Sequence, residues 1–219
     1  MRAATLAVAA GGALALASCT PGAPYGGAPE KQLAAATIAG DASKVAQLMA
    51  SGANPNKVVR VESDDESPWY LALSRIRERR PETVEIVRLM LKAGANPNEA
   101  WGTSGIGRPR VSAWRQFFSP GPGRRAGLRT ENPMRLAMFH PVADVVRALV
   151  ASGFDPRTGD SALVDAVEGG HAEITRILVE AGVNVNCRPG PNTPLVAAIE
   201  ARNVALMTYL EEHGAREKP

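Results

Sequence analysis

Residues 163–195 read LVDAVEGGHAEITRILVEAGVNVNCRPGPNTPL, and this stretch holds one complete structural unit of the chain. Leu163 and Ala166 are three residues apart and therefore share one face of a first helix. After two glycines, apolar residues return at helical spacing and predict a second helix, at Ile174, Ile177, Leu178 and Val179. Gly182 suits the left-handed residue that ends a helix, and an Asn-Val-Asn turn leads onward.

The same spacing occurs five times along the chain. An apolar residue is followed by Ala three positions later and by Gly nineteen positions later, with six extra residues in the second unit only. The apolar residues are Leu33, Trp69, Met134, Leu163 and Leu195. Three units open with a capping side chain before Pro at the first helical position, and Ser161-Ala162 is a weaker version of this opening. Because one unit cannot bury its apolar face alone, we expect the units to stack into an all-α solenoid.

The unit resembles the ankyrin repeat. The resemblance is carried best by GHAEI at 170–174, GVNVN at 182–186 and TPL at 193–195. It implies an ankyrin-repeat domain over about residues 30–216, built from helix–turn–helix units with short hairpin fingers and one long insertion. The expected units are 30–56, 67–98, 132–157, 161–186 and 193–216. The departures are Trp69 and Met134 in place of the usual Leu, a first unit without Thr-Pro, and a junction from Phe154 to Ser161 that is three residues short.

The N-terminus has the pattern of an export signal. Arg2 precedes a short uncharged run that ends in LASC at 16–19, which resembles the lipobox of bacterial lipoprotein signal peptides. The resemblance implies that residues 1–18 are removed and that Cys19 carries the lipid. An ordinary secretory signal with an incidental cysteine is the alternative. Thr20 is not Asp, which favours the outer membrane, facing the periplasm. Residues 19–29 are rich in Pro and Gly and are expected to form a flexible tether.

The largest irregularity is an insertion of about 27 residues within 99–131, between the second and third units. This segment holds six arginines and two acidic residues, a net charge of +4, together with four large aromatic residues. Such residues are enriched at binding hot spots, and the candidate partner-binding residues are Trp101, Arg108, Arg110, Trp114, Arg115, Phe117, Phe118, Arg124 and Arg125. The alternatives are a lid packed on the solenoid and a disordered segment. A second irregularity, the charged run at 74–82, is expected to lengthen the first helix of unit two and the turn after it.

Catalytic motifs, cofactor-binding motifs and metal-ligand spacings are not found in the sequence, and we expect neither an enzyme nor a cofactor. The chain has 219 residues, 45% of them hydrophobic, and its net charge of +3 is too small to indicate nucleic-acid binding. His171 is the usual histidine of the repeat and is expected to make hydrogen bonds in its local turn. Cys187 is interpreted as a tolerated surface thiol, with an intermolecular or redox role as the alternative.

These observations predict a monomeric, membrane-tethered periplasmic protein that binds a partner protein. The partner could be a secreted antibacterial effector that the chain neutralises as an immunity protein, or a periplasmic enzyme that it stabilises. The alternative is a structural envelope protein whose basic insert binds anionic lipid or peptidoglycan.

Overall fold

The computed structural model describes residues 25–62, 64–78, 81–102, 129–138 and 140–216. Within these residues ten α-helices form five antiparallel pairs. The first three pairs are α1 (Ala28–Ala39) with α2 (Ala42–Ala50), α3 (Pro68–Ser74) with α4 (Pro81–Lys92), and α5 (Pro133–Ala137) with α6 (Ala143–Ala151). The last two are α7 (Asp160–Glu168) with α8 (Ala172–Glu180) and α9 (Pro194–Glu200) with α10 (Val204–Glu212).

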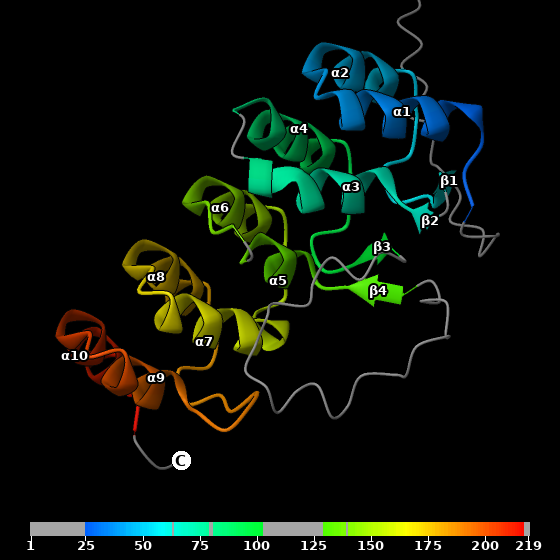
Figure 1. Cartoon of the computed structure of the whole chain (residues 1–219). Helices are drawn as coiled ribbons and strands as arrows, with labels where there is room; N and C mark the ends of the chain where they lie inside the picture. Colours follow the sequence, from blue (N-terminus) through cyan, green and yellow to red (C-terminus); the bar gives the residue numbers. More distant parts are fainter. Residues whose placement is uncertain (1–24, 63, 79–80, 103–128, 139, 217–219) are drawn as a thin grey trace, which may run out of the picture.

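The helix pairs stack side by side into an elongated solenoid. Figure 1 shows the odd-numbered helices in one layer and the even-numbered helices in the other, with the first and last pairs at opposite ends. The expected apolar and Ala positions are buried between the layers, since Leu33, Trp69, Met134, Leu163 and Leu195 are at most 2% exposed. One core of buried side chains extends from Leu33 in the first unit to Ala215 in the last.

The predicted helix caps are confirmed in three units and wrong in one. The side chains of Ser67, Asn132 and Thr193 each accept a hydrogen bond from a backbone N–H in the first turn of the following helix, which begins with Pro. Ser161 is not a cap, because α7 already begins at Asp160 and has Gly159 as its N-cap residue. A short 3-10 helix, Pro156–Thr158, precedes α7 and occupies the place of the missing residues in this junction.

A left-handed glycine follows the second helix of every unit, as the sequence predicts. The φ angles lie between 86° and 94° at Gly52, Gly94, Gly153, Gly182 and Gly214. L side chains rarely adopt this conformation, so the glycines let the chain leave each even-numbered helix in the same direction. The repeated turn keeps the units in register along the stack.

Asparagine side chains connect neighbouring units at three junctions. The Asn56 side-chain amide donates to the Gly94 carbonyl over 2.9 Å and accepts from the Asn96 N–H over 2.9 Å. Asn186 forms the same pair of bonds with Gly214 and Arg216, at 3.0 and 2.8 Å. Asn98 does so with Gly153 and Asp155, at 3.0 and 2.7 Å. We call each such pair of bonds an asparagine rung.

Two hairpin fingers extend from the odd-numbered layer. The first finger pairs β1 (Val59–Val61) with antiparallel β2 (Asp64–Glu66), and the second finger pairs β3 (Ala100–Gly102) with antiparallel β4 (Arg129–Glu131). Tyr25 forms a parallel β-bridge with Val58, and α1 begins at Ala28. The expectation of a tether up to residue 29 is therefore wrong for residues 25–29, which pair with the first finger or belong to α1.

The extra residues of unit two lengthen the turn after the first helix, as expected, but the expected longer first α-helix is wrong. α3 is only seven residues long and is followed by a 3-10 helix, Arg75–Glu78, whereas α4 has twelve residues. The insertion thus adds a 3-10 turn and a longer second helix, and it does not lengthen the first α-helix. Within the described residues, no helix combines the length and apolar character needed to cross a bilayer.

Candidate partner-binding face

The second finger is fixed to the start of α3 by two hydrogen bonds. The Ser67 N–H donates to the Trp101 carbonyl over 2.8 Å, and the Trp101 N–H donates to Ser67 Oγ over 3.3 Å. Ser67 is fully buried, so water does not compete for these bonds. The indole N–H of Trp69 donates to the Asn96 carbonyl over 2.8 Å and attaches the preceding turn to the same helix. The base of the finger is therefore part of the rigid solenoid.

The aromatic ring of Tyr70 packs against Gly102 at the end of β3. A Cβ atom at position 102 would lie 2.7 Å from three ring atoms of Tyr70, which is too close for any side chain. Tyr70 is itself buried, and α3 cannot move away without opening the core. Gly102 is thus the residue that lets the finger approach α3.

The structure describes one of the predicted partner-binding residues. Trp101 is half-buried on β3, at the base of the second finger. Cys19 and the other candidates lie outside the described residues: Arg108, Arg110, Trp114, Arg115, Phe117, Phe118, Arg124 and Arg125. Gly102 and Arg129 are paired across the two strands, so residues 103–128 begin and end at neighbouring points of the fixed finger.

The first finger carries acidic side chains next to a basic one. Arg60 and Asp65 form an ion pair of 3.0 Å across the two strands, and the Tyr25 hydroxyl donates to Asp65 over 3.3 Å. Glu66, at the end of β2, is only 6% exposed. These contacts join the N-terminal residues of the described chain to the finger and leave Arg60 largely in solvent.

A second acidic region lies on the exposed sides of α7 and α9. Asp165, Glu168 and Glu200 are all exposed, and we call them the acidic patch. Partial burial, followed by the charges of Asp165 and Glu200, raises the pKa of Glu168. Glu200 also accepts a hydrogen bond of 2.7 Å from the Asn192 side chain. The fields of the three carboxylates therefore overlap at this end of the odd-numbered layer.

Sequence reasoning missed the acidic patch, although a signal was present. Glu168 and Glu200 each stand five residues after the first buried Leu of their unit, at Leu163 and Leu195. Equivalent positions in adjacent repeats of a solenoid lie side by side. Charges compared by position within the repeat, and not along the chain, would have predicted their proximity.

Cys187 is buried, so its interpretation as a surface thiol is wrong. Its exposure is 3%, and its Sγ atom donates a weak hydrogen bond of 3.6 Å to the Asp160 carbonyl. Burial, together with the negative charge of Asp160, raises the pKa of the Cys187 thiol to about 12. The thiol is therefore protonated at neutral pH and out of contact with solvent, which disfavours a redox role in the folded protein.

Two histidines have defined local surroundings. The His171 N–H donates to the Ala166 carbonyl over 2.9 Å and its carbonyl accepts from the Thr175 N–H over 2.9 Å, so its local turn bonds are made by the backbone. Its ring makes no capping bond to α8 and lies against Gly169. The centroid of the His213 ring lies 4.1 Å from that of the Tyr209 ring, with the two planes tilted by 38°, and His213 Nδ1 lies 2.7 Å from the Tyr209 carbonyl. Over the described part of the chain, no three His, Cys, Asp or Glu side chains are grouped so that they could hold a metal ion.

Comparison with known proteins agrees with this architecture. Residues 134–218 match the family model for ankyrin repeats, in three copies. These copies correspond to the last three helix pairs, and the first two pairs have the same left-handed glycine and the same asparagine rung. No curated protein matches the chain significantly.

The chain is thus a helical repeat protein. Its fold is an all-α ankyrin solenoid, and its ankyrin repeats indicate a protein–protein interaction module.

Proposed function

We propose that this chain is a non-enzymatic binding protein, anchored to the bacterial envelope by a lipid on Cys19, which captures a protein partner in the periplasm. The observation that supports a binding role most directly is the second finger. Ser67 and Tyr70 fix its base to α3, so the Arg- and aromatic-rich residues that follow Gly102 are presented from a rigid support. A preordered support reduces the entropy lost on binding.

The proposed partner is a protein that the chain inhibits or stabilises. Neutralising a secreted antibacterial effector is one form of this function, and stabilising a periplasmic enzyme is the other. A toxin gene beside the gene of this chain would favour the first form. The arginines of residues 103–128 suit a partner with an acidic surface, because opposite charges speed association and fix orientation.

The central experiment compares the intact chain with a variant in which residues 103–128 are replaced by an Asn-Gly turn. Gly102 and Arg129 are already paired, so the shortened finger is expected to close as an ordinary hairpin with an unchanged melting temperature. We expect capture of the partner from a periplasmic extract to be lost. A Lys92→Ala variant, changed at an exposed site on α4, serves as the matched control that retains capture.

Two results would contradict the binding proposal. A large drop in melting temperature on shortening the finger would identify the insert as a structural lid. Salt-sensitive sedimentation of the chain with anionic vesicles, without capture of any protein, would favour the structural envelope function instead.

The lipid anchor has its own test. Growth with radiolabelled palmitate is expected to label the chain, and Cys19→Ser is expected to abolish the label and release the protein from the membrane fraction. Cys187→Ser is the matched control, because this buried cysteine lies between the fourth and fifth units, far along the chain from the lipobox. Equal labelling of the wild type and the Cys19→Ser variant would exclude the anchor.

A further inference from the structure

The junction between the third and fourth units differs from the other three. Asparagine rungs cross the first, second and fourth junctions, from Asn56, Asn98 and Asn186. The equivalent residue at the end of the third unit is Arg157. In the part of the chain that the structure describes, Arg157 makes no hydrogen bond to Gly182 or Asn184, the residues at which a rung would end.

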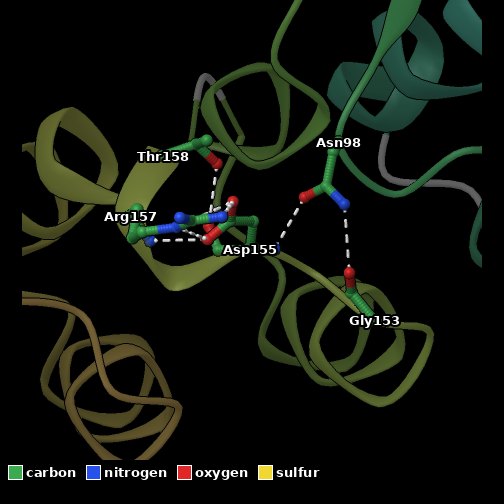
Figure 2. A network of polar contacts seen from close by, with 5 residues as sticks. All are labelled: Asn98, Gly153, Asp155, Arg157 and Thr158. Atoms are coloured by element: carbon green, nitrogen blue, oxygen red, sulfur yellow. Dashed lines mark hydrogen bonds and ion pairs between the residues drawn. The ribbon is translucent and has the colours of Figure 1, made fainter.

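Arg157 is instead bonded within its own turn. Its Nη2 lies 2.8 Å from an Asp155 carboxylate oxygen, its Nε lies 3.0 Å from the other, and its backbone N–H donates to the same carboxylate. Figure 2 shows Arg157 folded toward Asp155, while Asn98 connects Asp155 and Gly153 to the second unit. The Arg157 side chain is 89% exposed, so its removal uncovers no core.

Apolar packing joins the two units in place of a rung. A Cβ atom at Gly159 would lie 2.6 Å from Val183 and 3.0 Å from Phe154, and one at Gly182 would lie 3.8 Å from Pro156. In the even-numbered layer, Arg147 of α6 forms an exposed ion pair with Glu173 of α8. Apolar contacts are not directional and exposed ion pairs are weak, so neither fixes the angle between the units as a pair of backbone-directed bonds does.

We propose that the solenoid consists of two blocks, units one to three and units four to five, that are coupled most weakly at residues 156–159. The second finger belongs to the first block, and the acidic patch belongs to the second. The angle between these two surfaces is then set at one junction. The second block opens before the first when the protein is destabilised. This proposal does not rest on the proposed binding function.

The chain contains a separate probe for each block. Its three tryptophans are at positions 69, 101 and 114, before the proposed break, and Cys187 is buried after it. In a Cys19→Ser background, Cys187 is the single thiol. Urea titration is followed by tryptophan fluorescence and by a brief pulse of a thiol reagent at each urea concentration. We expect Cys187 to become reactive at about 1 M lower urea than the fluorescence midpoint, whereas coincident midpoints would overturn the proposal.

The second block could be less stable because the rung is missing or because the block is smaller. Two substitutions at one site distinguish these two causes. Arg157→Asn supplies the amide that a rung requires and is expected to narrow the gap between the two midpoints. Arg157→Ala removes the same side chain without supplying an amide, and the gap is expected to remain. An equal gap in both variants would show that the absent rung does not cause the weak coupling.

Discussion

At the residue scale, the burial of Cys187 determines the pKa of its thiol. Its side chain is 3% exposed, in a turn that the sequence placed at the surface. The misplacement has a simple cause, because residues in a turn alternate between solvent and the next unit, and composition does not reveal which side each one takes. The buried thiol fills space beside Asp160, and its high pKa follows from that position.

The pKa of Cys187 predicts a loss of stability at high pH. The pKa is raised from an ordinary value of 9.0 to about 12, so the folded state disfavours the thiolate. The stabilising effect of the neutral thiol is fully present below pH 9 and is lost as the pH rises toward 12. Urea unfolding at pH 8 and pH 10.5 is expected to show a steeper decline for the wild type than for Cys187→Ala. Equal declines in the free energy of unfolding of the two proteins would contradict the raised pKa of Cys187.

Gly102 provides a second test at this scale. Gly102→Ala places a methyl group against the buried Tyr70 ring and is expected to destabilise the protein by about 1–3 kcal/mol, as overpacking does. Gly190→Ala is the matched control, since a Cβ there meets nothing within 4 Å, and its effect is expected to stay within about 0.5 kcal/mol. Denaturant unfolding measures both, and equal effects would mean that the finger is not fixed by Tyr70.

At the element scale, the helices and their turns were predictable because each obeys a local rule. Pro after a capping side chain began α3, α5 and α9, and Gly ended every even-numbered helix. Where a local rule was weak, tertiary contacts decided. The N-cap residue of α7 is Gly159 and not Ser161, and a Cβ atom at Gly159 would be too close to Val183 and Phe154. The 3-10 turn at Arg75–Glu78 likewise had no signal in the periodicity.

The acidic patch predicts a pH-dependent effect on α7. The raised pKa of Glu168 means that its charged form is disfavoured in the fold, so its favourable contribution is present below its ordinary pKa of 4.5 and is lost as the pH rises. Glu168→Gln is therefore expected to raise the melting temperature slightly at pH 7, by less than about 3 °C, and to leave it unchanged at pH 3. Glu212→Gln on α10 is the control. A lower melting temperature of Glu168→Gln at pH 7 would contradict the repulsion proposed within the acidic patch.

At the scale of the whole molecule, a residue's cost of mutation depends on its place in the stack. Val167 and Ile199 occupy the same position in the fourth and fifth units. Val167 is fully buried because the fifth unit covers it, whereas Ile199 is 37% exposed. The proposed partner-binding residues have no equivalent positions in the other units, because they lie in an insertion that no repeat rule governs.

This difference gives a prediction for the stack. Val167→Ala is expected to cost about 2–3 kcal/mol, because it leaves a cavity between two units. Ile199→Ala is expected to cost less than about 1 kcal/mol, although it removes more atoms. Urea unfolding compares the two. A larger cost at Ile199 would mean that its face is covered in solution.

The β-bridge between Tyr25 and Val58 has a consequence for how far the solenoid stands from a bilayer. If Cys19 carries the lipid as proposed, only the chain from residue 19 to residue 25 separates the anchor from the first finger. A fully extended chain of that length reaches about 20 Å. The first finger would then lie within that distance of the lipid anchor, whereas the fifth unit is at the opposite end of the stack and is not held there by the anchor (Figure 1).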